Sequence, residues 1–260
     1  MLGDTYWHDK DLDVEDLARA VWDTVTALVR ETRELRQRWA IAVGHYAAAQ
    51  PASELVSDLG VLEYDFEALQ RVEDAPNWNL CRSLPDTIVS HVTFQAPAIK
   101  IQTTGAGDIT QRAAQQAERF LSASMRDAAA QQAARGALRL ATVMGTAWVR
   151  TWPDYDARRV RVRCYGPDRV LVDHRAAAHD EPTSQFFIDF VDQAELLAAH
   201  AGRSNAAKGA REIIEAETPA YSVTGLRRMI PVIEAVRIMD RETTGRRVVC
   251  VRGGVLVDEH

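Results

Sequence analysis

The chain has little lysine, and it has no long apolar run. Of its 31 lysine and arginine residues, only Lys10, Lys100 and Lys208 are lysines. With the frequent alanines, this scarcity points to a coding bias more than to a functional use of arginine. The sequence has no run of about 18 apolar residues, so we expect no membrane-spanning helix and no membrane partner. The first residues form neither a basic nor an apolar region, so no signal peptide is expected.

Cysteine is scarce as well. The chain has only Cys81, Cys164 and Cys250, and no two of them lie close in sequence. An odd number of distant cysteines excludes a Cys-x-x-Cys redox motif and the usual zinc-ligand spacing. We therefore expect three small, reduced side chains inside the fold, as is common for proteins of a reducing compartment.

The overall charge argues against a protein that grips nucleic acid. The 260 residues are 47% hydrophobic and 26% charged, with a formal net charge of −6. These values are typical of a globular protein with one large domain or two smaller ones. Tight binding to phosphates needs clustered lysine and arginine, which an acidic chain does not favour. The acidic net charge does not exclude a protein through which DNA passes without being bound tightly.

Motifs that carry chemistry are missing too. The sequence contains no Gly-x-Ser-x-Gly, no phosphate-binding loop and no kinase signature, so we expect neither an enzyme nor a bound cofactor. One loop leaves an alternative open, because it brings together carboxylates and imidazoles: Asp173, His174, His179 and Asp180. These residues could serve a metal-dependent hydrolase, although their spacing fits no compact metal motif. A polar surface loop is the simpler interpretation.

The periodicity of apolar residues predicts helices in the first part of the chain. We expect helices over residues 14–38, 40–49 and 79–93, and a long helical stretch from Asp108 to Gly145 with a break near residues 122–127. The charged run of residues 30–38 is interpreted as a solvated helix face, with a partner-binding face as the alternative. Residues 1–75 are thus predicted to form a helical N-terminal region.

The second part of the chain alternates like a sheet. Short strands are expected at residues 98–102, 148–152, 159–164, 185–191, 230–239 and 246–257, the last stretch being a hairpin that turns at Gly253. The predicted fold class is α+β: a helical N-terminal region followed by a mixed, mainly antiparallel sheet with packed helices. Residues 76–260 form the predicted α+β domain, which we expect to be incomplete at its C-terminal end because the last strand is short.

A row of arginines marks one predicted strand. Along residues 159–164, Val160, Val162 and Cys164 should face inward, whereas Arg159, Arg161 and Arg163 should face outward. Such a row is usually the solvent face of a half-buried sheet. It could also form an interface with another subunit or with nucleic acid.

The middle of the chain resembles the portal (head-to-tail connector) proteins of tailed bacteriophages, in the part that builds the wing. The resemblance covers roughly 70% of the chain. It rests on the order and spacing of several short features rather than on any single one. The residues that carry it are Asn79, Arg82, Asp86 and Thr87, the apolar stretch 98–101, Gly145-Thr146, the run Pro167-Asp168-x-Val170-x-Val172-Asp173, Val191-Asp192 with Leu196, and the hairpin 233–257.

The resemblance implies a ring-forming structural protein of the virion. Portal subunits assemble in the host cytoplasm as a closed ring, usually of twelve copies, at one vertex of the capsid. The implied partners are other copies of the chain, the scaffolding and capsid proteins, the terminase large subunit and the head-completion or adaptor proteins. Double-stranded DNA passes through the ring without sequence-specific binding. Another structural adaptor of the phage particle is the alternative within the same class.

Overall fold

The structure is a computed structural model of the whole chain. It has the predicted α+β class, with antiparallel strands and packed helices. Among the described residues, no helix is long and apolar enough to cross a membrane. The described residues are Trp7 and residues 12–47, 59–61, 79–94, 99–103, 107–154, 158–173, 184–200, 210–217, 229–238 and 245–259.

The chain divides into two compact units. The sheet unit comprises Met1–Arg36, Ser57–Val61 and Asp168–His260, and the helical unit comprises Gln37–Val56 and Leu62–Pro167. This division differs from the predicted boundary near residue 75, which lies outside the described residues. Part of the N-terminal region therefore belongs with the C-terminal strands, a long-range pairing that local sequence patterns do not reveal.

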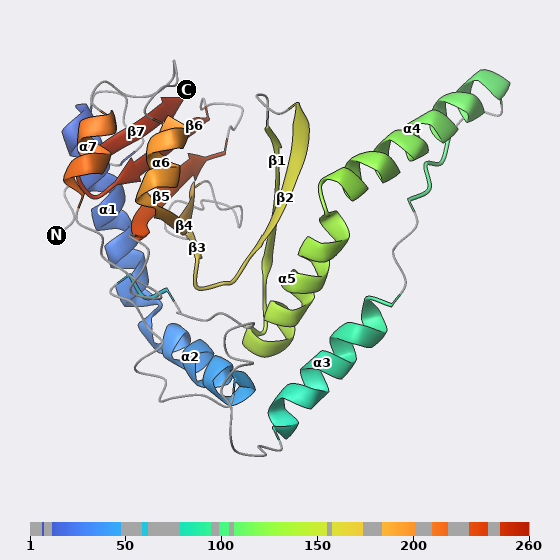
Figure 1. The fold of residues 1–260 in the computed structure, drawn as a ribbon, viewed down its shortest axis with the longest axis horizontal. Helices are drawn as coiled ribbons and strands as arrows, with labels where there is room; N and C mark the ends of the chain where they lie inside the picture. The colour runs from blue at the N-terminus through green and yellow to red at the C-terminus, as the bar shows by residue number, and fades with distance from the viewer. Residues whose placement is uncertain are drawn as a thin grey trace. The chain divides into compact units, whose positions relative to one another are not determined.

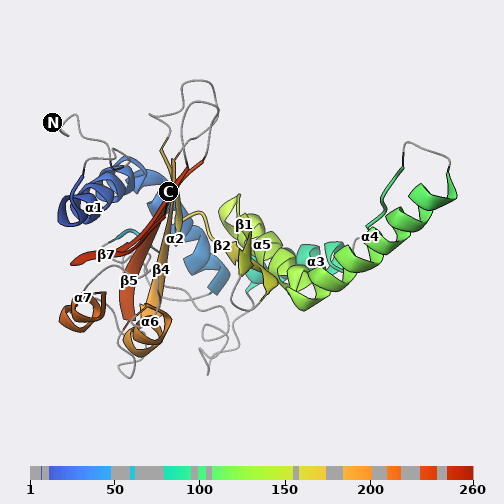
Figure 2. The same ribbon diagram turned by 90° about the horizontal axis from the view of Figure 1, so that it is seen from above.

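The described residues of the sheet unit form a five-stranded antiparallel sheet with helices on both faces (Figure 1). Its strands follow one another in space in chain order, each hydrogen-bonded to the next. Helix α1 covers one face and helices α6 and α7 cover the other, as Figure 2 shows with the sheet nearly edge-on. The elements are α1 (Val14–Glu31), β3 (Val170–Val172), β4 (Ser184–Asp192), α6 (Gln193–His200), α7 (Ala210–Ala216), β5 (Met229–Arg237), β6 (Arg246–Val251) and β7 (Gly254–Glu259).

Alternation along the strands fills both faces of this sheet. Ile233 on β5 is fully buried on the face under α1, whereas its neighbour Val232 belongs to the cluster under α6 and α7. Among the residues that the structure describes, the largest fully buried side chain is Phe186 on β4, which meets the ring of Trp7 edge to face at 5.7 Å between centroids. A sheet covered on both faces buries nearly every apolar side chain of its central strands.

In the described part of the helical unit, four helices pack with a two-stranded antiparallel ribbon. Its small core joins α2, α5 and the ribbon: Ala40, Val43, Leu140 and Met144, with Cys164 packed against them. The elements are α2 (Arg33–Ala47), which begins in the sheet unit, α3 (Leu80–Val92), α4 (Asp108–Asp127), α5 (Ala130–Met144), β1 (Trp148–Asp154) and β2 (Arg159–Tyr165).

Two helix breaks differ from the sequence prediction. The predicted helix 14–38 is divided at Thr32: α1 ends at Glu31, with Thr32 as its C-cap, and a new helix starts at Arg33. The long stretch after Asp108 breaks at Ala129, which takes a left-handed φ of 50°, slightly later than predicted. Both breaks depend on the backbone conformation of a single residue, which the apolar pattern does not record.

One predicted strand is wrong. Residues 99–103 are not in a strand; instead the Ile101 amide donates to the Glu118 side chain on α4 at 2.7 Å. The remaining predicted strands are confirmed, with β6 and β7 forming the expected hairpin. The helix predicted at residues 79–93 is confirmed as α3, which ends at Val92 and contains Pro85.

Candidate functional site

Asn79 is the first of the residues that carry the family resemblance, and its side chain joins two helices. Its side-chain oxygen accepts from the Arg82 amide and so caps the N-terminus of α3. Its Nδ2 donates to the carbonyls of His45 and Tyr46 at the end of α2, at 3.1 and 2.9 Å. Asparagine can do both because its amide group carries a donor and an acceptor. Asn79 therefore joins the end of one helix to the start of another.

Asp86 is the centre of a second tie. It accepts a hydrogen bond from the Tyr46 hydroxyl at 2.6 Å and pairs with Arg82 at 3.3 Å and with Arg139 of α5 at 3.8 Å. Burial, followed by the hydrogen bond to Asp86 and its charge, raises the pKa of Tyr46 to about 12. Arg82 also lies over the Tyr46 ring, 5.8 Å from its centroid. Asp86 thus links α2, α3 and α5 through one carboxylate.

Two other residues of the set have local roles. The Thr87 hydroxyl donates to the Ser83 carbonyl one turn earlier and is exposed. Gly145 ends α5 with a φ of 87°, a left-handed conformation that glycine adopts without a Cβ clash. Its amide donates to the Ala141 carbonyl, which closes the helix before β1 begins.

Asp168 and Pro167 lie at a buried turn before β3. Both are buried, and Asp168 has no exposed surface. The Asp168 carbonyl accepts a hydrogen bond from Nη1 of Arg36 at 2.7 Å, and the same nitrogen donates to the Gly60 carbonyl at 2.7 Å. Nε of Arg36 donates to the Thr32 hydroxyl at 3.0 Å. One buried guanidinium therefore holds three segments of the sheet unit.

This arginine clamp corrects the sequence prediction for Arg36, which assigned the charged run to a solvated face. Arg36 is only 2% exposed, and its burial lowers the pKa to about 10, an effect that the charge of Asp168 partly offsets. Position 60 favours glycine for two reasons. Its φ is +68°, and an added Cβ would lie only 2.8 Å from the Val29 side chain. Arg36, Gly60 and Asp168 lie at or within one residue of three points where the chain passes between its two units.

The proposed metal loop is only partly described. Val172 ends β3 opposite Gln185, and the amide of the buried Asp173 donates to the Ser184 carbonyl. His174, His179 and Asp180 lie outside the described residues, so their grouping stays a hypothesis. Within the described ranges, no three His, Cys, Asp or Glu residues lie where they could hold a metal ion.

The three strand arginines are exposed, as predicted. Arg159, Arg161 and Arg163 share one face of the β1–β2 ribbon, and Arg161 pairs with Asp154 at 2.6 Å. Cys164 on the opposite face packs into the core against α5. Val160 lies on the same face of the ribbon as Cys164, as predicted, but it is 41% exposed and so is not buried there.

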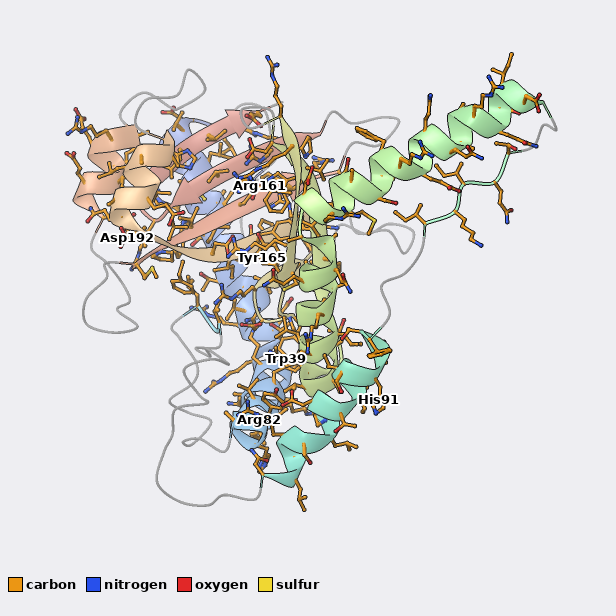
Figure 3. All side chains as sticks on the ribbon, turned by 45° about the vertical axis from the view of Figure 1, so that its right-hand side comes forward. Trp39, Arg82, His91, Arg161, Tyr165 and Asp192 are labelled. Atoms are coloured by element: carbon orange, nitrogen blue, oxygen red, sulfur yellow. The ribbon has the colours of Figure 1, made fainter. Side chains whose placement is uncertain are left out.

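Aromatic rings lie among these arginines. Arg163 stacks over Tyr165 at 5.0 Å, and Arg150 on the partner strand stacks over Trp152 at 5.2 Å. Directly opposed residues of an antiparallel pair lie on the same face, so these four side chains form one surface. Cation–π stacking supports a two-stranded ribbon, which is marginally stable alone. Figure 3 labels Arg161 and Tyr165 on this ribbon.

The outer face of α3 is apolar and exposed. Leu80, Leu84, Ile88 and Val92 recur every four residues and are 74%, 65%, 41% and 62% exposed. The side of α3 that packs on the unit carries Arg82, Asp86 and the buried Val89 instead. The apolar stripe itself contains no Asp, Glu, Lys or Arg; the other exposed residues of α3 are Cys81, serine, threonine and His91, which Figure 3 labels near the helix end.

Helix α4 is also apolar on one side and uncovered. It has no buried residue, although it touches α5 and β2 at its C-terminal part, and Figure 2 shows its N-terminal part extending beyond them. Its large exposed apolar side chains are Ile109, Phe120, Leu121 and Met125. Arg112, Arg119 and Arg126 recur every seven residues and so line another side of the helix.

Comparison with known proteins identifies no family for the chain. No protein-family model matches the chain, and no curated protein matches it. The portal family therefore enters below as a proposal only.

Sequence reasoning missed Tyr46, Arg139 and Arg36, whose partners are distant in the chain. It also missed the exposed stripe of α3, because a four-residue apolar spacing ordinarily predicts a buried face.

Proposed function

We propose that the chain is a structural subunit of a phage portal ring, at the capsid vertex through which double-stranded DNA enters and leaves. The observation that carries the proposal is the exposed, uncharged apolar face of α3. Monomeric proteins rarely leave such a contiguous face in water, whereas subunits of permanent assemblies bury it against their neighbours. Self-assembly therefore accounts for a surface that a monomeric enzyme would not need.

The roles of the family-like residues support the same proposal. Asn79, Asp86, Gly145 and Asp168 cap helices, link helices or stabilise a turn, and their partners are structural groups of the chain. These are the roles expected for residues that define a scaffold. In the proposed ring, the terminase, scaffolding and head-completion proteins would be the partners. The net charge of −6 suits a conduit that DNA passes without being held.

The particle mass in solution tests this proposal. Mass photometry of the wild-type chain, backed by negative-stain images, is expected to give a closed ring at a single high multiple of the 28.9 kDa protomer. A ring of this kind separates a portal from a monomeric adaptor or hydrolase. A chain that remains monomeric at micromolar concentration contradicts the proposal.

A further inference from the structure

We propose that the outer face of α3 on one copy of the chain packs against the apolar face of α4 on the next copy. The inference rests on the proposed ring and names its contact. The first surface, the α3 face, consists of Leu80, Leu84, Ile88, Val92 and the following Phe94. The second surface, the α4 face, consists of Ile109, Phe120, Leu121 and Met125.

The two faces fit each other in length and chemistry. From Leu80 to Val92 the stripe is about 18 Å long, and from Ile109 to Met125 it is about 24 Å long, at roughly 1.5 Å per residue. Charged residues are depleted from the cores of interfaces, and the α3 face contains no Asp, Glu, Lys or Arg. The arginines of α4 follow its other side and would flank the contact.

The available area is sufficient for a specific contact. Phe94 is 84% exposed, Ile109 is 84% exposed and Phe120 is 71% exposed, so most of each side chain is free to be covered. Aromatic side chains alone bury about 150–250 Å² each. Together the nine side chains offer on the order of 1,000 Å², which is the size that a biological interface has to reach.

A second copy is the occupant because one unit carries both faces. Within a single chain the α3 and α4 faces do not cover each other, since both are exposed. A closed ring needs two different, complementary patches on every subunit, and a head-to-tail contact uses one patch of each kind. The helical unit supplies such a pair, whereas among the described residues of the sheet unit the large exposed hydrophobics are only Val14, Leu35 and Ile238.

The test uses two variants of the full chain, each of which damages one face. The α3 variant carries Leu84→Glu and Val92→Glu, and the α4 variant carries Ile109→Glu and Phe120→Glu. The matched control is Ile238→Glu, which charges an exposed apolar residue of the sheet unit that is 47% exposed. Circular dichroism and thermal unfolding check that each variant is folded, and Leu84→Gln with Val92→Gln provides a milder form of the α3 variant.

Mass photometry is expected to show that each face variant is monomeric, whereas Ile238→Glu assembles like the wild type. An equimolar mixture of the two face variants is expected to give a one-to-one pair and nothing larger. The α4 face of the α3 variant and the α3 face of the α4 variant are both intact, so one contact forms and the remaining faces are damaged.

The outcomes separate this contact from the ring itself. A wild-type ring that persists in both variants overturns the α3–α4 contact and leaves the proposed function standing. Face variants that are monomeric but form no pair when mixed overturn the head-to-tail arrangement. Open oligomers of the wild type that both variants abolish support the contact and overturn the closed ring. A monomeric wild type overturns both.

Discussion

The sheet unit and the helical unit hold themselves together in different ways. In the sheet unit, helices cover both faces of the sheet, and the fully buried side chains include Phe186, Ile188, Ile233 and Leu256. In the helical unit the core is small, and most of the large exposed hydrophobic residues of the described chain lie there. Apolar burial thus stabilises the first unit, whereas the second depends on polar ties and leaves apolar surface for a partner.

This difference indicates that the sheet unit supplies most of the stability and that the helical unit supplies the surface for a partner. Burial of one large apolar side chain contributes about 1.5–3 kcal/mol to the free energy of unfolding. An exposed stripe of such residues does not make this contribution in the monomer. The stripe becomes stabilising only when another surface covers it. A self-assembling subunit with one self-sufficient unit and one unit completed by its neighbours would show this division.

The largest effect is expected from Phe186→Ala in the core of the sheet unit. The substitution removes a side chain with no exposed surface and its edge-to-face contact with Trp7. Loss of a buried phenylalanine usually costs about 3–5 kcal/mol, because a cavity remains. Urea denaturation monitored by hydrogen exchange should show that the loss of unfolding free energy occurs in the sheet unit. Ile41→Ala, at a 50% exposed site of α2 outside both proposed contact faces, is the control and should change the free energy of unfolding by less than about 0.5 kcal/mol. Equal losses for the two variants would contradict the comparison.

A somewhat smaller effect is expected from Arg36→Met, which removes the arginine clamp. The methionine keeps much of the volume but leaves the buried carbonyls of Gly60 and Asp168 without their donor. An unsatisfied buried group costs about 1–3 kcal/mol, so we expect a loss of about 3 kcal/mol for the pair. The midpoint of urea unfolding measures it. Arg38→Met, at an exposed position of the same helix, is the control and should be nearly neutral. A neutral Arg36→Met would show that the clamp does not stabilise the sheet unit.

The sequence predicted the fold class and most elements because local periodicity determines them. The cap at Asn79 and the helix end at Gly145 were among the marked residues, since asparagine and glycine signal helix ends. Arg36 was not recognised, because a charged residue in a charged helix gives no sign of burial. Its partners lie 24 and 132 residues away, a separation that no local pattern spans.

The same limit explains why the sequence alone did not reveal the proposed interface. The spacing of Leu80, Leu84 and Ile88 was visible in the sequence, but the same spacing suits a buried stripe and an exposed one. Which side of α3 faces the unit is decided by Asp86, whose partners Tyr46 and Arg139 come from two other helices. The polar side packs inward because these partners satisfy it, and the apolar side is left outside.

The smallest effect is expected from Tyr46→Phe, which tests the polar tie of the helical unit. Loss of the hydroxyl bond to Asp86 should cost about 1 kcal/mol at neutral pH, since Asp86 keeps Arg82 and Arg139. The pKa of Tyr46 is raised from 10 to about 12, by burial first and by Asp86 second, so the folded chain holds this proton more tightly than the unfolded chain. The contribution of Tyr46 is therefore fully present below pH 10 and is lost as the pH rises towards 12.

The wild type should lose stability across this window, and Tyr46→Phe should lose less. Urea unfolding at pH 9, 10 and 11 measures the difference between the two proteins. Cys250 contributes a slope of the same sign, because complete burial raises its pKa to about 12, but it lies in the sheet unit. Cys250→Ala therefore serves as the matched variant, which should keep the part of the slope that Tyr46 causes. If Tyr46→Phe keeps the full wild-type slope, the tie between α2 and α3 does not depend on this hydroxyl, and the apolar contacts of Ala40 and Val43 carry more of the helical unit than its polar links do.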